Sequence, residues 1–198
     1  MIQSVAFDID GTLTDDVEFT VKEFLNAYRI RYGKEYTKKI DYSIYPPENM
    51  FDSTIDDKEF LEKFKKDLWD KILNANEVPI RKHMIKLTND LHAKGIKVHI
   101  VTARMSGGYE DDYEDLDKKE TIIKRWLTTN GFYFDSFHFG IHEKINQLAS
   151  IGCDCLVDDS PEQALNVSKK FKVFLVDTPY NKLIKGNNIW RFYADDFE

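Results

Sequence analysis

Short hydrophobic runs rich in β-branched and aromatic residues recur along the chain. Such runs are typical of buried β-strands. Stretches with apolar residues at helical spacing lie between most of them, and several are followed by glycine, which commonly ends a helix. The pattern predicts strands at residues 2–9, 98–101, 134–139, 155–157 and 173–176, and helices at 80–94, 118–129, 143–151 and 161–170.

The alternation of strand and helix predicts the fold class. Strands that are almost continuously apolar indicate a parallel sheet with helices on both faces, so we expect a Rossmann-like open α/β fold. Residues 15–78 break the alternation with two helical patterns, one ending at Gly33 and one after Asp56, separated by a loop with two prolines. We therefore predict a small helical cap at 15–78, inserted into an α/β core formed by 1–14 and 79–198.

Composition narrows the possible partners. The 198 residues include 28 basic and 35 acidic side chains, which gives a formal net charge of −7. This balance argues against a nucleic-acid partner, because such proteins usually carry a basic face. No apolar run approaches the roughly 20 residues of a membrane helix, and no basic region precedes the first apolar run. We expect no membrane partner and a cytoplasmic location, and the oligomeric state stays open.

The two cysteines, Cys153 and Cys155, are separated by one residue. They cannot form a structural zinc site without further ligands, and a disulfide at this spacing would be strained. We expect two reduced, mostly buried cysteines.

The first predicted strand ends in an acidic motif, Asp8-Ile9-Asp10-Gly11-Thr12. Because strand side chains alternate, we expect Asp8 and Asp10 to point the same way at the carboxyl edge, where open α/β sheets bind ligands. Gly11 permits a sharp turn with backbone N–H groups close to an anion. Two carboxylates this close favour a shared proton or a divalent cation. The alternative is an acidic turn before a helix.

Two further segments carry groups suited to an anion. Thr102 and Ala103 follow the second strand, where a hydroxyl and N–H groups could hold a phosphate oxygen, and Arg104 could add charge-assisted bonds. Lys144 falls in the first turn of a helix, where the dipole disfavours a cation, so an anion is expected opposite it. The alternatives are an ordinary turn and an exposed lysine.

Two acidic segments remain. Asp158 and Asp159 end a buried strand before a helix that Ser160 can cap, and an acid there could complete an oxygen shell for Mg²⁺. Acids that merely favour the helix dipole are the alternative. The acidic run at 110–117 lacks the spacing of an EF-hand, so we interpret it as a solvated loop.

Taken in order, these four segments resemble the motifs of the haloacid dehalogenase superfamily of phosphohydrolases. The resemblance covers residues 2–159, and 15–78 falls where that family inserts its type 1 helical caps. The cap, the Val-Thr-Ala-Arg segment, Asp158 to Pro161 and the late Pro179-Tyr180-Asn181 are similar to members of the 5′-nucleotidase and deoxyribonucleotidase type.

The resemblance implies a role for each residue. Asp8 is the nucleophile that forms an aspartyl-phosphate, and Asp10 is the general acid and base. Mg²⁺ is held by Asp8, the Asp10 carbonyl and Asp159, while Asp158 orients Lys144. The phosphate is held by Gly11, Thr102, Ala103, Arg104 and Lys144.

Three functions remain open. The first is a Mg²⁺-dependent phosphomonoesterase for a small phosphorylated metabolite, namely a nucleoside monophosphate. The second is a phosphatase for sugar phosphates or another small metabolite. The third is a non-enzymatic, phospho-accepting regulatory module, which Asp10 and the inserted cap disfavour. Several aromatic residues of the predicted cap could stack on a nucleobase or simply form the hydrophobic core of the cap. They are Phe19, Tyr28, Tyr42, Tyr45 and Trp69.

Overall fold

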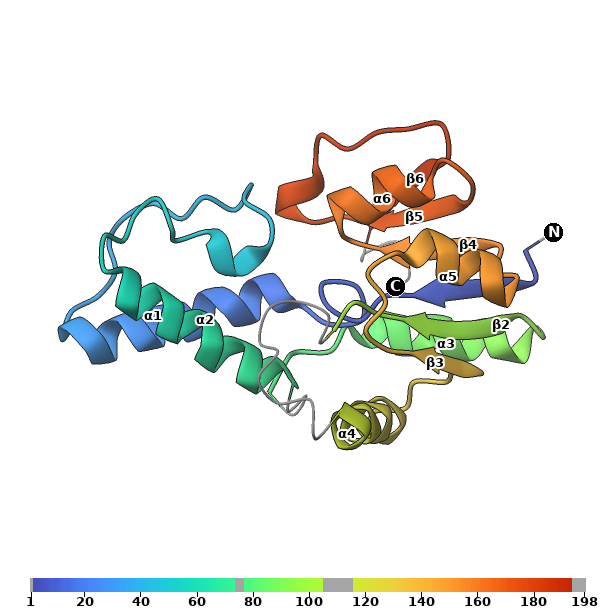
Figure 1. Ribbon diagram of the computed structural model, residues 1–198, viewed down its shortest axis with the longest axis horizontal. Helices are drawn as coiled ribbons and strands as arrows, with labels where there is room; N and C mark the ends of the chain where they lie inside the picture. Colours follow the sequence, from blue (N-terminus) through green and yellow to red (C-terminus); the bar gives the residue numbers. More distant parts are fainter. Residues whose placement is uncertain (1, 74–76, 105–115, 194–198) are drawn as a thin grey trace.

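The computed structural model describes residues 2–73, 77–104 and 116–193 (Figure 1). Within these residues, six parallel strands form one sheet in the order β3-β2-β1-β4-β5-β6. This open parallel sheet confirms the predicted Rossmann-like fold class. The strands are β1 Ser4–Phe7, β2 Lys97–Val101, β3 Ser136–His138, β4 Cys155–Asp158, β5 Lys172–Val176 and β6 Ile189–Phe192.

Alternate side chains of β1 enter two different cores. Val5 and Phe7 pack in one cluster with side chains of α3 and α4, whereas Ala6 packs in another with side chains of α5 and α6. Helices therefore cover both faces of the sheet, as the apolar strands predict. These helices are α3 Lys82–Ala93, α4 Leu116–Thr129, α5 Lys144–Ile151 and α6 Pro161–Val167.

Several element boundaries differ from the predictions. The first strand ends at Phe7 rather than at residue 9, so Asp8 and Asp10 lie beyond it. The helix that Ser160 caps ends at Val167 rather than at residue 170. Strand β6 was not predicted, because this short edge strand is only partly buried and its hydrophobic signal is weak. Cys153 and Cys155 are both free and buried, as expected.

The segment predicted to be a cap contains the two expected helices, α1 Asp16–Tyr32 and α2 Lys58–Leu73. A short 3₁₀ helix, η1 Pro47–Asn49, lies in the loop between them. Figure 1 shows these helices extending away from one end of the sheet. Their apolar side chains form a cluster of their own, centred on aromatic residues such as Phe24, Phe51 and Phe64. Domain limits at 15 and 78 remain a prediction.

Two chain segments connect the helices of this region to the sheet, and they are bonded to each other. Thr14 and Ile80 form an antiparallel bridge, and the N–H of Asp15 donates to the carbonyl of Pro79 at 2.8 Å. The Arg81 side chain donates to the carbonyl of Thr14. The two connections therefore lie side by side, directly after the acidic motif. None of the helices in the described part of the chain is long and apolar enough to cross a membrane.

Candidate active site

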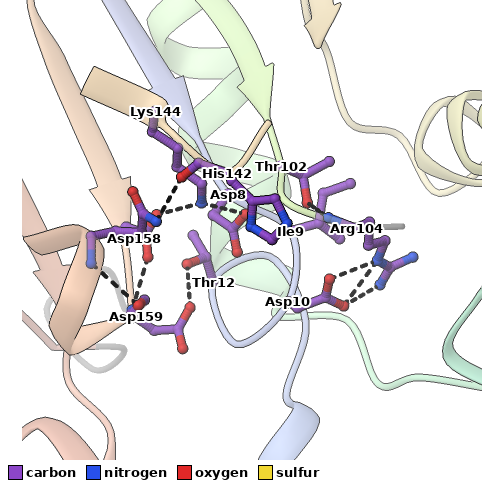
Figure 2. A network of polar contacts seen from close by, with 12 residues as sticks. Asp8, Ile9, Asp10, Thr12, Thr102, Arg104, His142, Lys144, Asp158 and Asp159 are labelled. Atoms are coloured by element: carbon purple, nitrogen blue, oxygen red, sulfur yellow. Dashed lines mark hydrogen bonds and ion pairs between the residues drawn. The ribbon is translucent and has the colours of Figure 1, made fainter. Parts of the chain in front are cut away.

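Charged side chains from three separate segments meet at the carboxyl ends of β1 and β4. Asp8 follows β1, Asp158 is the last residue of β4 and Asp159 follows it, while Lys144 begins α5. The two strands are direct neighbours in the sheet, which places their ends together. All four residues are at least 93% buried. The structure therefore brings these three segments together at one edge of the sheet (Figure 2).

Lys144 links two of the carboxylates. Its Nζ atom donates to Oδ1 of Asp8 at 2.7 Å and to Oδ2 of Asp158 at 2.6 Å. Burial disfavours the ammonium, but the charges of Asp158 and Asp8 outweigh it and raise the pKa of Lys144. Lys144 is therefore a fixed cation between Asp8 and Asp158. Asp158 also accepts the N–H of Ser160 through Oδ1 at 2.8 Å, and its role in orienting Lys144 remains a prediction.

Asp159 is held by neighbours from two other segments. Its Oδ1 accepts the hydroxyl of Thr12 at 3.0 Å, and its Oδ2 accepts the hydroxyl of Tyr180. The amide of Asn181 donates to the Asp159 carbonyl at 2.8 Å. Gly11 approaches this carboxylate so closely that a Cβ atom there would lie 2.3 Å from Oδ2. The left-handed backbone at Gly11, with φ of +73°, is the second reason why glycine is needed.

The acidic cluster has the charge and the donor atoms for a divalent cation. One carboxylate oxygen each of Asp8, Asp158 and Asp159 lies within 4.8 Å of the others. Burial raises the pKa of Asp8 to about 7 against the effect of Lys144, and it raises the pKa of Asp159 as well. Because one ammonium faces three buried carboxylates, burial disfavours their ionised forms, and a divalent cation would supply the charge that stabilises them. Oxygen donors in this number suit Mg²⁺.

Asp10 and Arg104 differ from the prediction. We expected Asp10 to point the same way as Asp8, but its carboxylate turns to Arg104 instead, because the strand alternation ends at Phe7. The Arg104 side chain donates through Nε to both oxygens of Asp10, at 2.9 and 2.8 Å. Its Nη2 donates to Oδ1 at 2.6 Å. Arg104 is thus paired with Asp10, and its phosphate-binding role is not tested by this geometry.

Thr102 and Ala103 lie beyond the end of β2, beside Asp8 in the order of the sheet. Thr102 is completely buried, and its hydroxyl oxygen accepts the backbone N–H of Arg104 at 3.2 Å. The hydroxyl hydrogen can therefore be donated elsewhere, for instance to a phosphate oxygen. The roles of Thr102 and Ala103 remain predictions.

Sequence reasoning missed three residues around this site. Thr12 and Tyr180 both bond to Asp159, and Asp16 is buried beside Thr14, which donates to it at 2.5 Å. Burial and the charge of Asp10 raise the pKa of Asp16 well above its usual range. A signal existed for Tyr180, which lies in the late Pro-Tyr-Asn segment. Thr12 belongs to the first motif, but nothing in the sequence pattern pointed Asp16 inward.

The aromatic residues that could stack on a base have different surroundings in the structure. Phe19 and Tyr28 belong to the apolar cluster of α1 and α2. Tyr45 is 41% exposed, and its ring lies 5.0 Å from that of Tyr180. Trp69 donates to Glu48 at 3.2 Å. Most of the acidic run at 110–117 lies outside the described residues.

Comparisons with known proteins give a matching family and a similar relative. The sequence profile of a family described as haloacid dehalogenase-like hydrolases matches residues 5–129. A protein of Clostridium acetobutylicum named as a nucleotidase is 30% identical over 195 residues, which cover 98% of this chain and 90% of that protein.

Solved structures show the same fold. A putative β-phosphoglucomutase from Thermotoga maritima aligns with a TM-score of 0.61 and 15% identity, covering 99% of this chain and 96% of that one. A putative phosphatase from Clostridium difficile aligns with a TM-score of 0.60 and 22% identity, covering 88% and 85%. At such identities the likeness concerns the fold alone.

Proposed function

The chain belongs to the haloacid dehalogenase-like hydrolases, and we propose that it is a Mg²⁺-dependent phosphomonoesterase that acts on nucleoside monophosphates. The observation that carries the proposal is the buried cluster in which Lys144 joins Asp8 and Asp158, with Asp159 beside them. The metal is assigned to Asp8, the Asp10 carbonyl and Asp159. Bound there, Mg²⁺ would neutralise charge on the transferring phosphoryl group.

Asp8 is the proposed nucleophile. Its Oδ1 accepts a hydrogen bond from Lys144, so the carboxylate has a fixed orientation at the carboxyl end of β1. Attack of a carboxylate oxygen on phosphorus forms an aspartyl-phosphate as the ester P–O bond breaks. Water then attacks phosphorus, the bond to Asp8 breaks, and inorganic phosphate is released with the Asp8 carboxylate restored.

Asp10 is the proposed proton-transfer residue. In its protonated form it gives a proton to the leaving oxygen in the first step, and as the resulting carboxylate it takes one from the attacking water in the second. A single acid–base pair contributes roughly 10²- to 10⁴-fold, whereas accelerations of phosphate-monoester hydrolysis reach about 10²¹-fold. Fixed charges must therefore supply most of the catalysis, and the buried position of Lys144 suits this task.

Two observations favour a nucleotide as the ester. The Clostridium acetobutylicum relative is named as a nucleotidase. The ring of Tyr45 lies 5.0 Å from that of Tyr180, whose hydroxyl donates to Asp159. The partly exposed ring of Tyr45 offers a surface on which a base could stack. A sugar phosphate is the second candidate substrate, and a non-enzymatic phospho-accepting module is the third function considered.

The test is a screen of phosphate esters with Mg²⁺ present, using nucleoside monophosphates, sugar phosphates and a generic aryl phosphate. We expect the highest kcat/KM with a nucleotide and a large loss of turnover in Asp10→Asn. Equal rates with all esters would contradict the nucleotide assignment. A long-lived phosphoryl-protein without release of phosphate would instead support the regulatory module.

Metal binding has a readout that does not depend on activity. Mg²⁺ that binds only the folded state raises its stability, by about 2.7 kcal/mol at 100 times the Kd. We expect Mg²⁺ to raise the melting temperature of the native protein and to have little effect on Asp159→Asn. An equal shift in both proteins would remove Asp159 from the metal site.

A further inference from the structure

The donors of the Arg104 side chain are already bonded to other groups of the protein. Its side chain has no solvent exposure, and three of its hydrogen bonds go to the carboxylate of Asp10. A further nitrogen, Nη1, donates to the backbone carbonyl of Ile72 at 3.3 Å. The guanidinium also lies 5.8 Å from the ring of Trp126. Figure 2 shows the Asp10 carboxylate turned toward Arg104, while Asp8 turns toward Lys144.

The two acceptors of Arg104 come from different parts of the fold. Asp10 follows β1, whereas Ile72 lies in the last turn of α2. Carbonyls in a last helical turn lack partners within the helix and carry partial negative charge, so a buried cation is well placed there. A guanidinium is planar and presents several donors in a fixed arrangement, so it fixes the orientation of a carboxylate as well as its position.

We infer that Arg104 is a positioning residue, which orients Asp10 for proton transfer and links that orientation to the end of cap helix α2. The inference rests on the proposed function, in which Asp10 is the acid and base. Arg104 itself touches neither the ester nor the nucleophile in this role. A displacement of Ile72 would change the contacts of Arg104 and, through them, the direction in which the Asp10 carboxylate points.

The sequence suggested a different role, namely a direct phosphate contact by Arg104, and the two roles predict different kinetics. kcat/KM reports the steps up to departure of the leaving group. An alkoxide needs a proton to depart, so loss of a correctly oriented Asp10 slows alkyl esters most. A p-nitrophenolate departs without one. A phosphate contact is shared by both esters, so its loss would affect them equally.

The experiment compares the native protein with Arg104→Met, Asp10→Asn and the double variant, on a simple alkyl phosphate and on p-nitrophenyl phosphate. We expect Arg104→Met to lower kcat/KM by roughly 10²-fold on the alkyl ester and by less than about 5-fold on the aryl ester. We expect the double variant to match Asp10→Asn within about 2-fold, because both changes remove one function.

Equal losses on the two esters, or losses that multiply in the double variant, would overturn the inference. Arg104→Lys keeps the charge, but an ammonium lacks the planar arrangement of donors that fixes the direction of a carboxylate, so we expect it to restore only part of the alkyl-ester activity. Full restoration would also count against positioning. If Arg104→Met does not fold, the leaving-group ratio of Arg104→Lys decides the question in the same way.

The link to the cap is measured by hydrogen exchange. We expect faster amide exchange in the last turn of α2 in Arg104→Met but not in Asp10→Asn. Unchanged exchange in Arg104→Met would remove α2 from the inference. A native protein that hydrolyses no phosphate ester would overturn the proposed function, whereas hydrolysis with equal losses on both esters would overturn only the role of Arg104.

Discussion

The site at the sheet edge and the interior of the cap bury opposite kinds of side chain. At the sheet edge Asp8, Lys144 and Asp158 are buried together, with Lys144 2.7 and 2.6 Å from the two carboxylates. In the cap the buried residues are mainly aromatic and aliphatic. Phe24 is stacked on Phe51 with ring centroids 3.5 Å apart and an interplanar angle of 5°.

The difference shows that the two regions serve different purposes. Burying several charges costs free energy that ion pairing only partly returns, so the cluster at the sheet edge does not exist for stability. Burying aromatic rings is favourable, and the cap interior stabilises itself in this way. Changes at the sheet edge should therefore reduce activity and spare the fold, and changes in the cap interior should do the reverse.

The largest effect is expected for Asp8→Asn. An amide of the same size cannot attack phosphorus, so we expect kcat to fall by at least about 10⁴-fold, as for other nucleophiles. Lys144 keeps Asp158 as a partner, so the free energy of unfolding should change little. Turnover of an aryl phosphate and urea unfolding measure the two quantities.

Asp90→Asn is the matched control for this change. Asp90 lies on α3, has a side chain that is 51% exposed and pairs with Lys86 at the surface. We expect native kcat in this variant. Activity retained in Asp8→Asn would remove Asp8 as nucleophile, and unfolding of Asp8→Asn would contradict the separation of activity from stability.

The second prediction concerns Phe24→Ala in the cap interior. Phe24 is completely buried and contacts Phe51, Tyr36 and Phe64 through its ring. Truncation leaves a cavity, so the free energy of unfolding should fall by about 3–5 kcal/mol. Chemical denaturation at low temperature, where the variant is still folded, gives the value. Turnover of an aryl phosphate by the folded variant should stay within about 10-fold of native, since the charged cluster is unchanged.

Ile30→Ala is the control on the same helix. Ile30 is 75% exposed, so its truncation should change the free energy of unfolding by less than about 0.5 kcal/mol. A loss of more than about 10³-fold in turnover by folded Phe24→Ala would contradict the comparison, because it would show that the cap interior shapes the chemistry.

Two glycines sharpen the comparison further. Gly11 and Gly33 both have left-handed backbones, with φ of +73° and +65°. A Cβ at Gly11 would lie 2.3 Å from Oδ2 of Asp159, whereas nothing lies within 4 Å of one at Gly33. Both alanine variants should lose about 1–2 kcal/mol of stability from backbone strain. Only Gly11→Ala should lose activity, by about 10²-fold, because it displaces Asp159.

Melting curves and kcat of the two variants check this prediction. Full activity in Gly11→Ala would show that Asp159 can move without consequence, and it would weaken the assignment of that residue to the metal. An equal loss of activity in Gly33→Ala would point to strain alone as the cause.

The sequence predicted the core of the site because parallel strands bring their carboxyl ends to one edge. Asp8, Asp158 and Lys144 follow from that rule, since each lies at a strand end or at the start of a helix. The turn of Asp10 toward Arg104 did not follow. Strand alternation fixes side-chain direction only within a strand, and β1 stops at Phe7, so the direction of Asp10 depends on tertiary contacts.

The same limit applies elsewhere in the fold. Strand β6 was not predicted, because an edge strand whose side chains are only partly buried lacks a strong apolar pattern. The contact of Tyr180 with Asp159 joins residues 21 positions apart, and no local rule relates them. In the cap, helical spacing identified α1 and α2. It could not distinguish the aromatic residues buried inside the cap from those that are exposed to solvent.

The smallest expected effect distinguishes two exposed aromatic residues of the loop between α1 and α2. Tyr45 lies beside Tyr180 and near the charge of Asp159, whereas Tyr42 lines a separate groove of about 910 Å³ against α1. The two residues are similarly exposed, at 41% and 42%. If a base stacks on Tyr45, Tyr45→Ala should lose about 10-fold in kcat/KM for a nucleoside monophosphate, since stacking contributes roughly 1–3 kcal/mol.

The same variant should lose less than about 2-fold on glycerol phosphate, which has no base, and Tyr42→Ala should lose less than about 2-fold on both esters. A uniform loss on both esters in Tyr45→Ala would mean that this ring shapes the site rather than selecting the ester. A nucleotide-specific loss in Tyr42→Ala would move the base to the groove beside α1. The first outcome would remove Tyr45 from the choice of ester. The second would leave that choice to the loop between α1 and α2 but assign it to Tyr42. Neither outcome would change the role of the charged cluster.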